Sequence, residues 1–172
     1  MKNEIKEFTP VAIFLGVIIG IIMTAANVYL GLYAGMTVSA SIPAAVIAMG
    51  VFKGILKINS VHQSNIVQTM ASAGESLAAG IIFTLPALVI VGAWKDFAFW
   101  PTTMIAISGG LLGVIFMIPL RSALIKNEKE LIYPEGVACA AVLQAAGDEN
   151  DPAAVEQGKK GFLSILKGLF IG

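Results

Sequence analysis

Apolar stretches separated by short polar connections run along most of the chain. Between Val11 and Phe52 there is no Asp, Glu, Lys or Arg, and this interval can hold two membrane crossings because about 20 apolar residues span a bilayer core. The whole pattern predicts spans at about 10–30, 38–52, 76–94 and 102–120. It indicates an all-α fold, a polytopic transmembrane helical protein with a polar or broken helix and a re-entrant segment.

The first span carries a face of small residues. It is expected to begin at Thr9 and Pro10, which suit the N-cap and the first helical position. An amide at bilayer depth needs a partner, so Asn27 serves either as packing glue or at a broken-helix binding point. The link that follows is either a tight buried turn or the result of a helix break near Asn27. The small-residue face, which predicts close packing against another helix, consists of Gly16, Gly20, Thr24, Asn27 and Gly31.

The most informative segment covers 61–80 and is rich in Gln, Asn, Ser and Thr. Asn65, Gln68, Ser72 and Glu75 are spaced by three, four and three positions, so they share one face of a helix. A carboxylate at the bilayer centre costs about 2.5–3.5 kcal/mol or more, so Glu75 is expected to face a cavity or a partner. Two interpretations stay open. The face lines a pathway for substrate or protons, or its first turns lie at the cytoplasmic interface, where polarity costs little.

A second unusual segment follows a charged loop. The run over 134–147 is too short to cross a bilayer and is predicted to be a re-entrant segment or half-helix, which is tolerated only where it lines protein or a cavity. Tyr133 and Glu135 at its start are candidate pathway residues, ranked below the Asn65 to Glu75 face because of the charged loop before them. The segment 159–172 has apolar residues on one helical face and predicts an amphipathic helix or the next span.

Composition and charge narrow the functional class. Hydrophobic residues make up 57% of the chain and charged residues 13%, whereas soluble domains carry about 25% charged residues. The net charge is zero, which gives no reason to expect a nucleic-acid partner. The single histidine, His62, and the single cysteine, Cys139, have no metal-ligand spacing, so no metal or other cofactor is expected. No phosphate-binding loop or nucleophile–base pattern occurs, and the protein is expected not to be an enzyme.

Basic residues are divided unequally between the two sides of the predicted spans. By the positive-inside rule, this division predicts a multi-pass protein of the cell (cytoplasmic) membrane with its N-terminus in the cytoplasm. Lys95 alone falls on the outer side. The inner side carries Lys2, Lys6, Lys53, Lys57, Arg121, Lys126 and Lys129.

Three motifs carry a family resemblance. They are Asn27-Val-Tyr-Leu-Gly-Leu-Tyr-Ala-Gly-Met-Thr37, Asn65-Ile-Val-Gln-Thr-Met-Ala-Ser-Ala-Gly-Glu-Ser76 with the following Leu85-Pro86-Ala87, and Tyr133-Pro-Glu-Gly-Val-Ala-Cys-Ala140. The last is similar to a Tyr-Pro-Ser-Gly-Thr-Ala-type element. Together the motifs, which span Thr9 to about Gly147, resemble the oligopeptide transporter (OPT) family, including its yellow-stripe-like branch of metal-chelate transporters.

The resemblance implies a secondary transporter, a proton-coupled symporter of small peptides or peptide-like metal chelates. It places the Asn65 to Glu75 face along the pathway and Tyr133 to Gly136 at the opening of a broken element. Glu135 stands where Ser is usual and Val137 where Thr is usual, and the extra carboxylate could favour cationic ligands or coupling protons. Family members are several times longer, so residues 1–172 are expected to be the N-terminal part of one transport domain that packs against the remainder of the chain in the lipid bilayer. The alternative is a membrane-embedded structural or assembly subunit without transport activity.

Overall fold

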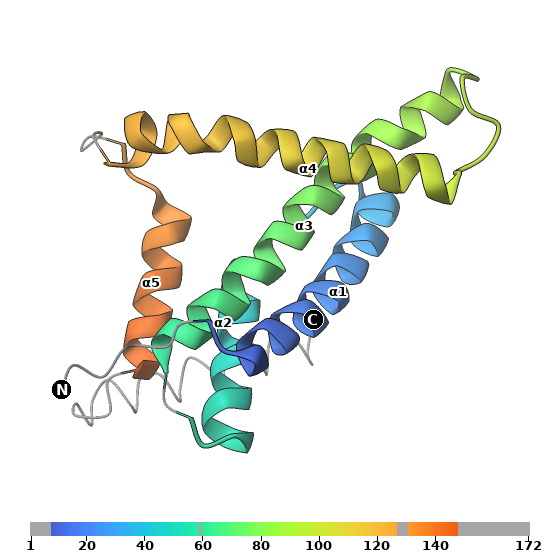
Figure 1. The fold of residues 1–172 in the computed structure, drawn as a ribbon. Coiled ribbons are helices and arrows are strands. Elements are labelled where there is room, and N and C mark those ends of the chain that lie inside the picture. The colour runs from blue at the N-terminus through green and yellow to red at the C-terminus, as the bar shows by residue number, and fades with distance from the viewer. Residues whose placement is uncertain (1–7, 59, 127–130, 148–172) are drawn as a thin grey trace.

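The computed structural model describes residues 8–58, 60–126 and 131–147, and every regular element within these ranges is helical (Figure 1). In chain order the elements are α1 (Pro10–Ala34), α2 (Ser41–Gly50), the π-helical turn η1 (Val51–Ile55), α3 (Val61–Ile90), α4 (Phe99–Arg121), the π-helical turn η2 (Ser122–Lys126) and α5 (Pro134–Gly147). Three helices in this described part are long and apolar enough to cross a membrane, namely Pro10–Ala34, Val61–Ile90 and Phe99–Lys126. The predicted fold class, a helical transmembrane protein, is confirmed.

The helix bounds differ from the predicted spans in two places. The segment predicted as a full crossing at 38–52 forms α2 and η1, which have ten and five residues and together extend only about 22 Å. The span predicted at 76–94 begins at Val61 instead, so the polar and apolar halves of this region form one continuous helix, α3. The element predicted at 159–172 lies outside the described residues.

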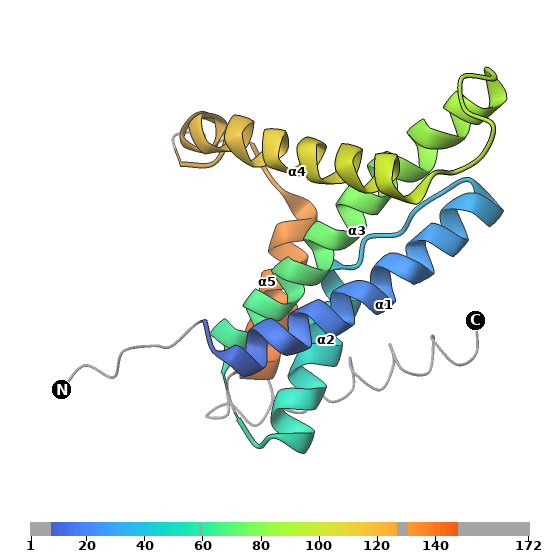
Figure 2. The same ribbon diagram turned by 45° about the vertical axis from the view of Figure 1, so that its right-hand side comes forward.

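Helices α1 and α3 form the central pair and run parallel to one another (Figures 1 and 2). Their N-terminal ends are joined because the Thr9 hydroxyl donates a hydrogen bond to Oε1 of Gln63 over 3.1 Å. Each helix also has a side-chain cap. Thr9 accepts a hydrogen bond from the backbone of Ala12, and Ser60 accepts one from the backbone of Gln63.

The small-residue face of α1 makes the contact with α3, as its spacing predicts. A Cβ atom added to Gly16 would lie 2.8 Å from Sδ of Met70, and one added to Gly74 would lie 2.9 Å from Oγ1 of Thr24. Both distances are shorter than real Cβ contacts, so a side chain at either position would force Met70 or Thr24 to shift, and glycine allows the close packing without such a shift. The interpretation of this face as a packing surface is confirmed.

Because α1 and α3 are parallel, the chain between them has to return across the same thickness. Helix α1 ends at Ala34, its C-cap Gly35 has a left-handed φ of 71°, and a non-helical link over 35–40 then runs back beside α3 (Figure 2). Helix α2 begins near the middle of α3, where the hydroxyls of Ser41 and Ser72 are 3.0 Å apart. The return crossing is therefore half non-helical link and half helix.

This arrangement corrects the expectation for the end of the first helix. Helix α1 continues without interruption through Asn27 to Ala34, so neither a helix break at Asn27 nor a tight turn over 31–36 occurs. The break in helical structure lies after α1, in the link 35–40. Pro43 falls in the first turn of α2, where a missing backbone N–H removes no helical hydrogen bond.

Helices α4 and α5 pack very differently. Helix α4 diverges from the α1–α3 pair (Figure 1), and none of its residues is buried against the described part of the chain. Helix α5 lies along α2 and the N-terminal half of α3. Its Cys139 and Leu143 are buried in a small apolar cluster with Ala45, Val46 and Met49 of α2.

Candidate functional site

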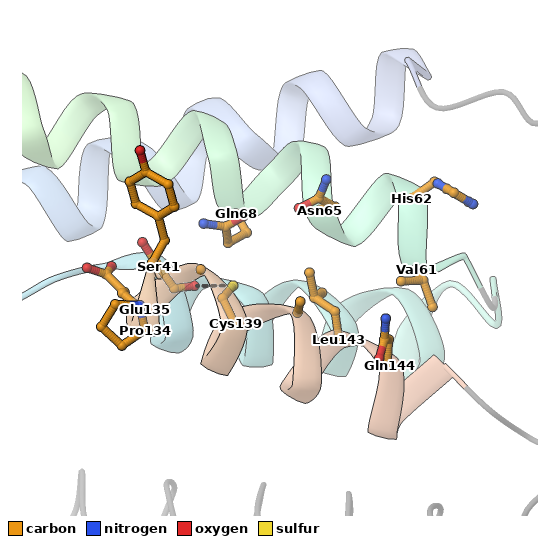
Figure 3. Close-up of a pocket in the computed structure, with 13 residues that line it drawn as sticks. Ser41, Val61, His62, Asn65, Gln68, Pro134, Glu135, Cys139, Leu143 and Gln144 are labelled. Atoms are coloured by element: carbon orange, nitrogen blue, oxygen red, sulfur yellow. Dashed lines mark hydrogen bonds between the residues drawn. The ribbon is translucent and has the colours of Figure 1, made fainter. Parts of the chain in front are cut away.

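A cleft of about 750 Å³ lies between the N-terminal half of α3 and helix α5 (Figure 3). The start of α2 closes one end of it with Ser41, and Val61 and His62 lie toward the other end. Its wall combines apolar and polar side chains. The polar ones are Ser41, His62, Asn65, Gln68, Tyr133, Glu135 and Gln144.

The helical period of α3 explains why its amides face this cleft. Ser64, Val67 and Ala71 are buried on the side of α3 that packs against α1 and α2. Asn65 and Gln68 lie on an adjacent side, where Asn65 is exposed and Gln68 half-buried, and both line the cleft. These two amides are thus separated from the apolar contact face by about a quarter turn.

The cleft unites residues that the sequence placed in two separate motifs. Asn65 and Gln68 come from α3, whereas Tyr133 and Glu135 come from the start of α5, yet all four line the same space. Tyr133 is anchored there because its hydroxyl donates a hydrogen bond to the carbonyl of Leu124 over 2.8 Å. Tyr133 and Glu135, which the sequence ranked lower because of the preceding charged loop, thus lie beside the two amides of α3, and the function of all four stays a prediction.

A group of hydroxyls closes the end of the cleft at which α2 and α5 begin. The Ser39 hydroxyl donates a hydrogen bond to Oε1 of Glu135, and the Ser41 hydroxyl pairs with that of Ser72 at 3.0 Å. The Cys139 thiol lies 4.0 Å from the carbonyl oxygen of Ser41. These contacts join the link, α2, α3 and α5 at one level, and we call Ser39, Ser41, Ser72 and Glu135 the hydroxyl cluster.

Sequence reasoning missed Ser39 and Ser41 because their partners lie far along the chain. The only local signal was a Ser-x-Ser pattern two positions before Pro43, which is typical of a helix start. His62 and Cys139 were considered only as metal ligands in the sequence and were not predicted to belong to the site. Both line the cleft, and Cys139 is also buried among the apolar residues of α2.

Glu75 lies beyond the hydroxyl cluster and does not line the cleft. Its residue is 6% exposed and sits about one helical turn past Ser72, close to the middle of α3. Within the described ranges, no residue forms a hydrogen bond or ion pair with its carboxylate. The predicted polar face is therefore divided among the cleft (Asn65 and Gln68), the hydroxyl cluster (Ser72) and a buried position (Glu75).

Asn27 has a structural partner away from the cleft. Its Nδ2 donates a hydrogen bond to the carbonyl of Val38 over 2.7 Å, and its Oδ1 accepts one from the backbone N–H of Val38 over 2.9 Å. The buried amide thus pairs with both polar groups of one residue in the non-helical link, as a neighbouring strand would. Such pairing meets the requirement that non-helical backbone at membrane depth be satisfied by protein.

The chain matches known proteins along most of its length. Residues 7–172 match a family model described as OPT oligopeptide transporter protein. A protein of Haemophilus influenzae named "Putative oligopeptide transporter" is 46% identical over 121 residues, which are 70% of this chain and 18% of that protein. The chain thus spans less than a fifth of the length of this curated relative. No solved structure matches the chain. The resemblance of the three motifs is confirmed, and the chain belongs to the oligopeptide transporter (OPT) family.

Proposed function

We propose that the protein moves oligopeptides across the cell membrane and that the cleft between α3 and α5 is part of the substrate path. The observation that carries the proposal is the cleft itself, since it gathers amide, hydroxyl and carboxylate groups within a helical membrane protein. Polar groups at such positions are costly unless they serve a ligand or a partner. Membership of a transporter family supports transport rather than catalysis, and the proposal assigns no catalytic residue.

The chemistry of the cleft suits a peptide backbone. The side-chain amides of Asn65 and Gln68 each offer donors and an acceptor, which match the N–H and C=O groups of peptide bonds. Val61 and Leu143 add apolar surface that can cover peptide side chains. A volume of about 750 Å³ lies within the range of about 300–1,000 Å³ that is usual for small-ligand sites. Peptide-like metal chelates offer the same amide and carboxylate groups and are the second substrate class of this proposal.

The orientation rests on the positive-inside rule. With the N-terminus in the cytoplasm, the N-terminal end of α3 also lies on the cytoplasmic side, because α1 and α3 are parallel. The cleft then occupies the cytoplasmic half of the membrane, and the hydroxyl cluster separates it from the outer half. Non-helical backbone beside such a site is a general feature of transporters that alternate between two openings.

Protons are the proposed coupling ion, with Glu75 as the residue that carries them. Glu75 is 6% exposed within a helix long and apolar enough to cross a membrane, and acidic side chains inside such helices often mark proton or ion paths. Glu75 lies about one helical turn past Ser72, so a change in its charge would act next to the Ser41–Ser72 contact at the end of the proposed substrate path.

Uptake into proteoliposomes containing the full-length protein tests the function. We expect di- to tetrapeptides to accumulate when a pH gradient is imposed and not without it. Replacing Asn65 and Gln68 together by Ala should lower uptake at least about fivefold, because each lost hydrogen bond weakens binding by about 0.5–1.5 kcal/mol. Ser76→Ala, on an exposed part of α3 outside the cleft, is the matched control.

Failure to accumulate peptides would direct the same assay to metal chelates. If chelates also failed to accumulate under either condition, transport would be refuted and the structural-subunit alternative would take its place.

A further inference from the structure

We propose that Glu135 selects substrates that carry a free, protonated amino terminus, an inference that rests on the proposed transport function. Glu135 is the only acidic or basic side chain, histidine apart, among the described residues that line the cleft. It lies in the first turn of α5 and is exposed to the cleft rather than packed against an apolar wall. This single carboxylate gives its end of the cleft a negative potential.

The immediate partners of Glu135 leave its charge in place. Ser39 donates a hydrogen bond to Oε1, and the hydroxyls of Ser39 and Ser41 lower the pKa of the Glu135 carboxyl. Hydroxyls stabilise a carboxylate without neutralising it. Two of them occupy at most two of its roughly four acceptor positions. The remaining positions can accept the N–H groups of an ammonium ion, which offers three donors.

The length of the cleft indicates where the residues that follow the amino terminus of a short peptide would bind. Glu135 and Ser41 mark one end in Figure 3, Gln68 and Asn65 follow along α3, and His62 lies toward the other end. From Gln68 to His62 the helix rises about 9 Å, and an extended peptide covers about 3.3–3.6 Å per residue. A substrate of about three residues with its amino group at Glu135 would therefore extend along the amides of Gln68 and Asn65.

Two other roles for Glu135 are less well supported. A divalent metal ion needs several ligands, and no group of three His, Cys, Asp or Glu side chains is found in the part of the chain that the structure describes. Proton coupling is served better by a buried carboxylate, and Glu75 is 6% exposed whereas Glu135 is open to the cleft. A peptide amino group, with a usual pKa of about 7.7–8.0, is largely protonated at neutral pH and complements the charge directly.

Uptake of trialanine and N-acetyl-trialanine by the full-length protein in proteoliposomes tests the proposal. Acetylation removes the positive charge and changes little else along the peptide. We expect the wild-type KM to be at least about tenfold lower for trialanine than for N-acetyl-trialanine. Glu135→Gln should reduce this ratio to about threefold or less, and Glu135→Asp should restore much of it. Asp96→Asn, in the exposed turn before α4, should keep the wild-type ratio.

Each other outcome has a definite meaning. Equal KM values for the two peptides in the wild type, or an unchanged ratio in Glu135→Gln, would overturn the selection of an amino terminus while leaving peptide transport intact. Loss of gradient dependence for both peptides in Glu135→Gln with the ratio preserved would show a coupling role and also overturn the inference. Absence of any peptide accumulation by the wild type would overturn this inference and direct the test of the proposed function to metal chelates. The thermal unfolding midpoint of Glu135→Gln shows whether the variant is folded.

Discussion

Asn27 supplies with one side chain what a neighbouring strand would supply to Val38. Both hydrogen bonds are short, at 2.7 and 2.9 Å, and the asparagine residue is 4% exposed. Since the N–H and C=O of Val38 belong to no helix, their pairing at this depth depends on Asn27. The residue is therefore a structural anchor for the link 35–40, whereas Asn65 and Gln68 are open to a ligand.

Asn27→Leu should destabilise the protein. The substitution leaves the N–H and C=O of Val38 without their partner, and an unsatisfied buried polar group costs about 1–3 kcal/mol. We expect a corresponding fall in the thermal unfolding midpoint of the purified full-length protein in detergent. Asn65→Leu is the matched control and should change stability by no more than about 0.5 kcal/mol, because that asparagine is exposed. Equal midpoints for the two variants would contradict the anchor role.

Glu75→Gln should uncouple transport from the pH gradient. The amide is close to the carboxyl group in shape but cannot release a proton, so peptide exchange should continue while gradient-driven accumulation falls at least about tenfold. Peptide exchange is measured with labelled peptide at equal internal and external concentrations. Gradient-driven accumulation is measured as net uptake with an imposed pH gradient. Gradient-driven accumulation that survives in Glu75→Gln would remove this residue from coupling.

At the scale of whole elements, the small size of glycine determines how closely α1 and α3 pack. A Cβ atom on Gly20 would lie 3.5 Å from Cα of Ala71, an ordinary contact, so alanine fits at this position. The space beyond that Cβ is occupied by the backbone of α3, which cannot move away as a flexible side chain can. Larger side chains at Gly20 would therefore have to separate the two helices.

Gly20→Leu should lower stability by about 1–3 kcal/mol, the usual cost of overpacking, whereas Gly20→Ala should be nearly neutral. Gly80→Leu is a control within the same pair, because no atom lies within 4 Å of a Cβ at Gly80. Thermal unfolding of the full-length protein in detergent compares the three variants. A loss in Gly80→Leu as large as that in Gly20→Leu would mean that helix packing is not the cause.

Local signals were enough to predict most elements from sequence. Thr9 and Pro10 gave the start of α1, the short apolar run gave α5 with the bounds that the structure has, and the spacing of Asn65 and Gln68 gave a shared polar face. The return of the chain over 35–40 could not be predicted, because it depends on a side chain that pairs with backbone eleven positions away. Asn65 and Gln68 lie near Glu135 because α5 packs against α2. No periodic pattern in the sequence indicates this packing.

At the scale of the whole molecule, helix α4 presents an apolar surface that no described residue buries. The matched relative is more than five times as long as the region it shares with this chain. We expect α4 to face lipid or further helices of a complete transporter, since an apolar surface of this extent is not stable in water.

The two ends of the α4 span give a direct test of orientation. In a full-length protein without other cysteines, Lys95→Cys should react with a membrane-impermeant maleimide in intact cells, because it lies on the predicted outer side. Lys126→Cys should react only after the membrane is made permeable. Both side chains are exposed, so access to the reagent depends on the side of the membrane alone. The opposite labelling pattern would reverse the proposed orientation and place the cleft in the outer half of the membrane.

The segment between α1 and α3, half non-helical link and half helix, has a consequence for membrane insertion. Helix α2 with η1 is too short to partition from the translocon into lipid as an independent span, and the backbone of 35–40 would enter hydrocarbon unpaired. Asn27 is available as soon as α1 is made, but Ser72 and the packing surface around Ala71 are synthesised only with α3. We therefore expect the segment formed by the link 35–40, α2 and η1 to enter the bilayer only after α3 has been synthesised. The translocon would then insert α1 and α3 as spans, and the segment between them would insert by packing against both.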